Sequence, residues 1–269
     1  MSRVSTKTSL GLTSHAADVT LRFVGEDVVS GGVRQRRFDV DCDGHTVPGN
    51  LWTPDGGGGG SRPLVLIGHG AGTSKSEPYV VSLARRFVRH HGYSALALDG
   101  PLHGDRRRDG GGFAISFVEF AQAWANEPHL IDNSIAEWSA TLDALAALPE
   151  MRTGPVGYWG LSMGTILGLP LVAAEPRIKA AVLGLMGITG PTKARHADDA
   201  VKVTVPVLFL VQWDDELFAR DTSFALFDAL GSPDKRLHAG PGAHSALSRE
   251  EFEDTERFLA HHLGPAVGR

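Results

Sequence analysis

Residues 155–169 read PVGYWGLSMGTILGL. They contain a Gly-x-Ser-x-Gly pentapeptide with Ser162 in the middle, between two apolar runs. The first run predicts a buried strand, and the second predicts a helix that begins directly after the pentapeptide. A sharp turn between a strand and a helix exposes a serine hydroxyl, because Gly160 and Gly164 let neighbouring backbone pass where a Cβ atom would clash. Ser162 is therefore a candidate nucleophile that needs a base and an acid elsewhere in the chain.

A second buried strand is predicted at residues 63–67, PLVLI, which run directly into the glycine-rich turn GHGAG at 68–72. Such a turn exposes backbone N–H groups, which can bind the oxyanion of a tetrahedral intermediate. We expect the N–H groups of Ala71 and Met163 to be the donors. Gly70 remains the alternative to Ala71, since one residue of register is not fixed by the pattern.

The candidate acid follows a third apolar run, VPVLFLVQ at 205–212. Asp215, just beyond that run, lies where a carboxylate could orient a catalytic histidine and stabilise its charged form. Asp214 is the alternative acid. Glu216 is interpreted as a solvated or turn-capping charge.

The candidate base is His244, in the glycine- and proline-containing stretch LHAGPGAHS at 237–245. Loops commonly carry catalytic bases on a rigid sheet, and a helix is predicted to begin just after this one. His69 is interpreted as a packing residue bonded to backbone, and His238 as part of a strand.

These residues follow one another as nucleophile Ser162, acid Asp215 and base His244, an order that differs from those of chymotrypsin and subtilisin. With the turn at 68–72, they resemble the α/β-hydrolases, most of all esterases and dienelactone-hydrolase-like members, from about residue 36 to the end. The resemblance implies an α/β-hydrolase fold and serine hydrolase activity. Dienelactone hydrolases carry cysteine at the nucleophile position, so Ser162 favours general ester hydrolysis over lactone cleavage.

The remaining pattern predicts an α/β protein with a mostly parallel sheet, an antiparallel N-terminal start and helices on both faces. Strands at 18–24, 37–41 and 45–52 form the antiparallel start. We expect a loose N-terminal segment at 1–16 and a single domain at 17–269. The glycine run at 56–60 is interpreted as an exposed loop rather than a linker.

Composition limits the number of domains, the cellular compartment and the kinds of partner that we expect. The 269 residues suit one α/β domain, and Cys42, the single cysteine, excludes an intramolecular disulfide and fits a reducing compartment. A net charge of −5 favours neither nucleic acid nor an anionic membrane surface. No apolar stretch is long enough for a membrane span, and we expect a cytoplasmic protein.

The substrate pocket is expected under two possible cap segments, 100–130 and 186–200, at the carboxyl ends of the strands. The candidate substrate-binding residues are His103, Phe117, Met186 and Phe218. Aromatic residues spaced along one helical face, from Phe113 to Trp124, favour a core stripe, with a pocket-lining lid as the alternative. The arginines at 106–108 favour a solvated turn over an anion site.

The predicted function is hydrolysis of a carboxylic ester of a small to medium substrate through an acyl-enzyme. A lyase or acyltransferase on the same scaffold is one alternative, and a non-catalytic binding module is another. The mechanism requires no metal and no organic cofactor. Substrate identity and oligomeric state are not indicated by the sequence.

Overall fold

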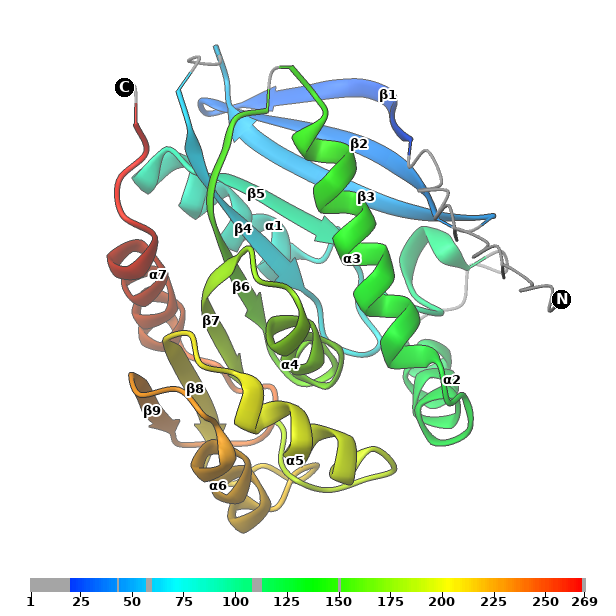
Figure 1. The fold of residues 1–269 in the computed structure, drawn as a ribbon, viewed down its shortest axis with the longest axis vertical. Helices are drawn as coiled ribbons and strands as arrows, with labels where there is room; N and C mark the ends of the chain where they lie inside the picture. Colours follow the sequence, from blue (N-terminus) through cyan, green and yellow to red (C-terminus); the bar gives the residue numbers. More distant parts are fainter. Residues whose placement is uncertain (1–19, 43, 57–59, 108–112, 150, 268–269) are drawn as a thin grey trace, which may run out of the picture.

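The computed structural model of the chain describes residues 20–42, 44–56, 60–107, 113–149 and 151–267, which form a nine-stranded sheet with helices on both faces (Figure 1). The strands are β1 (Leu21–Ser30), β2 (Val33–Cys42), β3 (His45–Pro54), β4 (Arg62–Gly68), β5 (Ser94–Leu98), β6 (Thr153–Gly160), β7 (Ile178–Gly184), β8 (Val207–Gln212) and β9 (Lys235–Gly240). The helices are α1 (Pro78–Arg86), the π-helical turn η1 (Phe87–His91), the 3-10 turn η2 (Gly104–Arg106), α2 (Phe113–Asn126), α3 (Leu130–Ala146), α4 (Met163–Ala174), α5 (Lys193–Lys202), α6 (Arg220–Ala229) and α7 (Arg249–Leu263).

The strands lie in the order β1-β2-β3-β5-β4-β6-β7-β8-β9. Strands β1, β2 and β3 pair antiparallel, β3 pairs antiparallel with β5, and the strands from β5 to β9 pair in parallel. The predicted mostly parallel sheet with an antiparallel start is therefore confirmed. Leu64 to Ile67 in β4 are completely buried, as a continuous apolar run in a central parallel strand requires.

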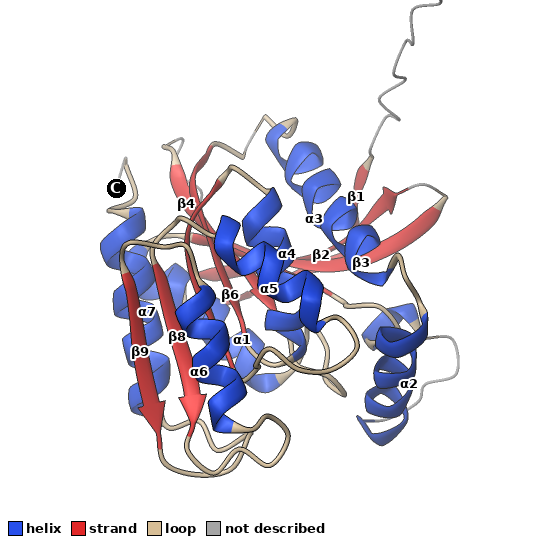
Figure 2. Ribbon diagram, turned by 60° about the horizontal axis from the view of Figure 1, so that its bottom comes forward, coloured by secondary structure: helices blue, strands red, loops and turns tan. Residues whose placement is uncertain are grey.

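Two hydrophobic cores hold the helices against the sheet. Helices α3, α4, α5 and α6 cover one face, and α1 and α7 cover the other (Figure 2). Trp138 and Ile166 belong to the first core, and Phe87 and Phe258 to the second. Within the described ranges, every helix is too short or too polar to cross a bilayer.

Two strand boundaries differ from the sequence-based expectation. Strand β1 begins at Leu21 and continues to Ser30, because a register shift between Val24 and Val28 breaks the alternation but not the pairing. Strand β2 begins at Val33, directly after a two-glycine turn at 31–32 in which both residues have positive φ. Residues 1–16 and 57–59 lie outside the described residues.

Parallel strands end at a common edge of the sheet, and this edge collects the predicted site. Loops leave it after β4, β6, β8 and β9, and these loops carry Ala71, Ser162, Asp215 and His244. The topology thus brings together four segments that are far apart in the sequence.

Candidate active site

Ser162 occupies a strained turn between β6 and α4. Its backbone has φ 58° and ψ −119°, and its N–H donates to the Gly184 carbonyl at 3.0 Å. Positive φ is uncommon for a residue with a side chain and persists only where surrounding structure enforces it. Close packing also explains why residue 164 is a glycine, since a Cβ atom there would lie 2.5 Å from the Gly68 carbonyl oxygen.

A hydrogen-bonded relay joins three side chains. His244 Nε2 lies 2.9 Å from Ser162 Oγ, and His244 Nδ1 lies 2.8 Å from Asp215 Oδ2. Because Asp215 accepts a hydrogen bond from Nδ1–H, Nε2 of the neutral ring carries the lone pair and accepts the hydrogen bond from the serine hydroxyl. Asp215 Oδ1 in turn accepts the N–H groups of Leu217 at 2.8 Å and Phe218 at 2.9 Å, which fixes the carboxylate.

The surroundings keep Asp215 ionised. Burial raises the pKa of its carboxyl, but the hydrogen bonds from His244 and from backbone N–H groups outweigh burial and lower the pKa below its ordinary value. Asp214 is exposed and does not contact His244 in the described structure, while its N–H donates to Gly242. Glu216 is exposed, and its carboxylate accepts the backbone N–H of His244 at 2.8 Å, which agrees with the interpretation of a solvated or turn-capping charge.

The glycine-rich turn after β4 supplies a free amide beside Ser162. Gly70 N–H donates to Tyr79 Oη at 2.8 Å, and this leaves Ala71 as the better-placed donor of the two candidates. Ala71 and Met163 both line a cavity at Ser162. In the part of the chain that the structure describes, neither of their N–H groups has a hydrogen-bond partner.

Two cavities meet at Ser162 and share Ala71, Phe117 and Leu217. The first measures about 380 Å³, and the second about 260 Å³. The first includes His244, Ser245, Leu247, Trp159 and Phe252. The second includes Met163, Ile166, Phe120, Trp124 and Phe218. Both are mainly apolar, which is typical of small-molecule sites.

Charge is nearly absent from these two cavities. Glu216 is the only acidic or basic side chain apart from His244 among their described lining residues. Of the predicted arginine turn, Arg106 binds Glu137 through two contacts of 2.8 Å, and Arg107 pairs with Glu119. Arg108 lies outside the described residues. The cavities therefore suit a neutral ligand rather than an anion.

The structure divides the predicted substrate-binding residues into two pairs. Phe117 and Phe218 line the cavities. His103 and Met186 are fully buried and line neither cavity. The aromatic stripe of α2 was interpreted as core, but Phe120 and Trp124 also line the second cavity.

Sequence reasoning missed a buried ion network behind the turn. Lys75 is 2% exposed, and its Nζ lies 2.5 Å from Asp99 Oδ2 and 2.7 Å from Asp105 Oδ2. Since Lys75 lies 24 residues before Asp99 in a polar stretch, no local pattern identifies the pair. Among the residues described, no group of three or more His, Cys, Asp or Glu side chains is arranged to hold a metal ion.

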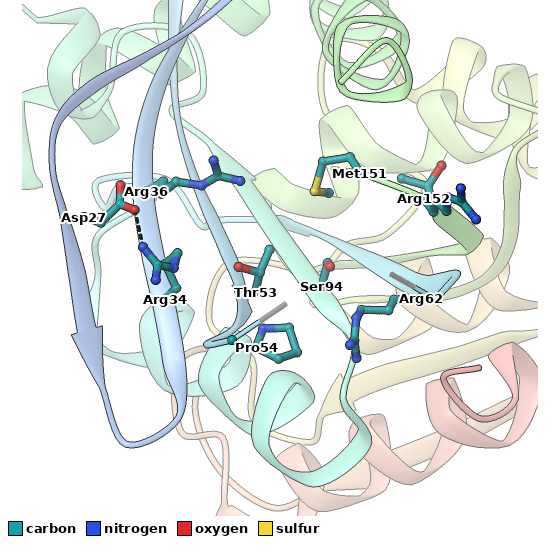
Figure 3. A pocket seen from close by; sticks show the side chains of 12 residues that line it. Asp27, Arg34, Arg36, Thr53, Pro54, Arg62, Ser94, Met151 and Arg152 are labelled. Carbon is teal, nitrogen blue, oxygen red and sulfur yellow. Dashed lines mark hydrogen bonds and ion pairs between the residues drawn. The ribbon is translucent and has the colours of Figure 1, made fainter. Parts of the chain in front are cut away.

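Another pocket, of about 400 Å³, opens at the opposite end of the sheet (Figure 3). Arg62, Ser94 and Thr153 line it at the beginnings of β4, β5 and β6. Arg34, also in its lining, is paired with Asp27 at 2.7 Å. None of the residues around Ser162 reaches this pocket, so it is separate from the relay.

Comparison with solved structures identifies the family to which this fold belongs. A cold-adapted esterase from an Arctic intertidal metagenomic library, in complex with polyethylene glycol, is 40% identical, with a TM-score of 0.81 over 90% of this chain and 100% of that one. The native structure of the cold-adapted esterase is 38% identical over the same shares, with a TM-score of 0.75. The chain therefore belongs to the esterases of the α/β-hydrolase fold.

More distant structures share the fold. Dienelactone hydrolase from Anabaena variabilis is 20% identical, with a TM-score of 0.66, over 87% of this chain and 100% of that one. Acetyl xylan esterase from Paenibacillus sp. R4 is 17% identical, with a TM-score of 0.68, over 91% of this chain and 89% of that one. No protein-family model and no curated protein matches the chain.

Proposed function

We propose that this chain is a carboxylesterase-type serine hydrolase that cleaves neutral, apolar esters of small to medium size through an acyl-enzyme at Ser162. The observation that carries the proposal is the position of His244, within hydrogen-bond distance of both Ser162 Oγ and Asp215 Oδ2. Membership among the esterases supports the same reaction class.

The reaction follows from this geometry. His244 Nε2 takes the Ser162 proton as Oγ attacks the carbonyl carbon, and Asp215 stabilises the imidazolium that forms. The N–H groups of Ala71 and Met163 bind the oxyanion, and losing one such donor costs about 3–4 kcal/mol in comparable sites. His244 then protonates the departing alcohol, and water repeats the sequence on the acyl-enzyme.

The two cavities take different halves of the ester. The leaving oxygen must lie near His244 to receive its proton, so the alcohol occupies the first cavity, which His244 and Ser245 line. The acyl group then occupies the second cavity, between Ile166, Trp124 and Phe218. Because no basic side chain other than the catalytic base His244 lines either cavity in the described structure, neutral esters are favoured over substrates that carry a carboxylate.

Replacement of the nucleophile tests this function. We expect Ser162→Ala to lower kcat for a short-chain p-nitrophenyl ester by a factor on the order of 10³ or more, because no acyl-enzyme can form. Ser82→Ala is the matched control, since Ser82 is exposed on α1 outside both cavities. Circular dichroism establishes that both variants fold. Near-full activity in Ser162→Ala would falsify the proposed function.

Product analysis separates hydrolysis from acyl transfer to another acceptor. In isotopically labelled water, hydrolysis places one labelled oxygen in the carboxylic acid product, because water attacks the acyl-enzyme. An acyl group found mainly on an added alcohol at low alcohol concentration would instead identify a transferase.

A further inference from the structure

The turn that carries Ala71 is held by the amides on either side of it. Gly70 N–H donates to Tyr79 Oη at 2.8 Å, and Gly72 N–H donates to His103 Nε2 at 2.8 Å. Both acceptors belong to segments outside the turn. The Ala71 N–H between them has no partner in the described residues, so the two contacts fix the peptide planes that flank a free donor.

His103 is built to accept a hydrogen bond. Its side chain is fully buried, and Nδ1–H donates to the Pro101 carbonyl at 2.7 Å. A neutral imidazole carries one N–H, so Nε2 presents its lone pair to Gly72. Burial lowers the pKa of His103, which favours this neutral form. The rings of Phe120, at 5.9 Å, and His69, at 5.2 Å, pack against it and restrict its rotation.

The segment that carries His103 is itself tied to the turn. Gly100 N–H donates to His69 Nε2 at 2.9 Å, and Asp105 N–H donates to Asp99 Oδ2 at 2.8 Å. The Lys75 ammonium joins Asp99 and Asp105 from the other side. Since a buried charge pair with several hydrogen bonds is costly to separate, these contacts hold the two segments together.

We propose that His103 is a positioning residue for catalysis: by accepting the Gly72 N–H, it directs the Ala71 N–H toward the oxyanion that forms at Ser162. Tyr79 acts in the same way on Gly70. The inference rests on the proposed function, because it requires an oxyanion at this place. His103 thus acts on the reaction through the backbone and not by contact with substrate.

Two substitutions of similar size distinguish this role from simple packing. Gln is long enough to place its side-chain oxygen near the position of Nε2, so His103→Gln keeps an acceptor for Gly72. Asn reaches only the position of Nδ1, so His103→Asn keeps the contact with Pro101 and loses Gly72. We expect His103→Asn to lower kcat roughly 10–100-fold with KM changed less than about twofold, and His103→Gln to stay within about fivefold of the wild-type kcat.

A trifluoromethyl ketone reports on the oxyanion directly. Ser162 Oγ adds to its carbonyl carbon, the serine proton passes to His244 Nε2, and the carbonyl oxygen becomes an anion at the turn. We expect its inhibition constant to rise in His103→Asn by the same factor as kcat/KM falls. A loss of packing alone would not link these two quantities. Tyr79→Phe keeps the ring and removes the acceptor for Gly70. We expect its inhibition constant for the ketone to rise, and its kcat/KM to fall, by a smaller factor than in His103→Asn.

The outcomes separate this inference from the proposed function. Activity that survives Ser162→Ala overturns the proposed function, whatever the His103 variants do. If Ser162→Ala is inactive while His103→Asn and Tyr79→Phe both keep wild-type kcat and ketone affinity, only the positioning role is wrong. Equal losses of kcat in His103→Asn and His103→Gln also overturn the positioning role. If His103→Asn does not fold, the kcat of Tyr79→Phe and its affinity for the ketone decide the question.

Discussion

At the scale of single residues, the site depends on an approach between two backbones. Gly164, in the first turn of α4, lies so close to β4 that an added Cβ atom would be 2.5 Å from the Gly68 carbonyl oxygen. Neither backbone can rotate away as a side chain would. The glycine therefore allows α4 to begin directly above the strand that leads to the Ala71 turn.

We expect Gly164→Ala to lower the free energy of unfolding by about 1–3 kcal/mol and to reduce kcat, because helix and strand must separate. The unfolding change is measured by urea denaturation. Gly70→Ala is the control for stability, since its Cβ atom would lie 3.7 Å from Tyr79 Oη, an ordinary contact. Equal urea midpoints for wild type and Gly164→Ala would show that the approach is not constrained.

Some residues of the site could be predicted from the sequence, and others could not. Ser162 and Asp215 each follow an apolar strand pattern and His244 follows a predicted strand that contains His238; parallel strands end at one edge, so the proximity of the three side chains could be inferred. His103 and Lys75 could not be assigned in this way. Their partners, Gly72 and Asp99, are 31 and 24 residues away, and those contacts depend on how two loops pack.

At the scale of elements, a chain of hydrogen bonds links α2, α5 and α4 behind the acyl cavity. Trp124 Nε1–H donates to Thr192 Oγ1 at 2.5 Å, and the Thr192 hydroxyl lies 3.0 Å from His196 Nδ1. His196 Nε2–H donates to the Ile166 carbonyl at 2.8 Å. Burial lowers the pKa of His196, and both ring nitrogens face backbone carbonyl oxygens, Nε2 that of Ile166 at 2.8 Å and Nδ1 that of Thr192 at 2.9 Å.

This chain of contacts predicts how acyl-chain length is selected. We expect Trp124→Ala to raise kcat/KM for p-nitrophenyl hexanoate relative to the acetate by roughly tenfold or more, because each methylene in the enlarged cavity gains about 0.8 kcal/mol. Thr192→Val removes the acceptor for the indole, and we expect a smaller shift in the same direction. Thr192→Ser keeps the hydroxyl and should retain the wild-type ratio. A ratio that is unchanged in Trp124→Ala would place the acyl chain elsewhere.

Element boundaries were harder to predict than element types. The buried strands β4 and β6 begin and end within about two residues of their apolar runs, because Gly and Pro bound those runs. Strand β1 is largely exposed beyond Val24, and so its sequence lacks the alternation that marks a half-buried strand.

At the scale of the whole molecule, one carboxylate of α7 binds side chains of α1 and η1, the first helical segment of the chain. Glu256 of α7 binds Arg86 of α1 at 2.6 Å and accepts hydrogen bonds from His90 at 2.6 Å and His91 at 3.0 Å. Burial raises the pKa of Glu256, but the hydrogen bonds from both histidines and from Arg86 outweigh it and lower the pKa to about 2.

The sign of the pH effect follows from this lowered pKa. The unfolded chain binds the Glu256 proton near pH 4.5 and the folded protein near pH 2, so the contribution is complete above about pH 5 and is lost as pH falls through that window. We expect Glu256→Gln to lower the free energy of unfolding by about 2–3 kcal/mol near pH 7, and by much less near pH 2. Urea titrations of both proteins at a series of pH values measure the difference. Glu253→Gln, one turn earlier, removes only surface ion pairs with Arg249 and Arg257, and should lower the free energy of unfolding by much less than Glu256→Gln does. A Glu256→Gln deficit of the same size across the pH range would mean that side-chain shape, and not the charge, joins α7 to α1 and η1.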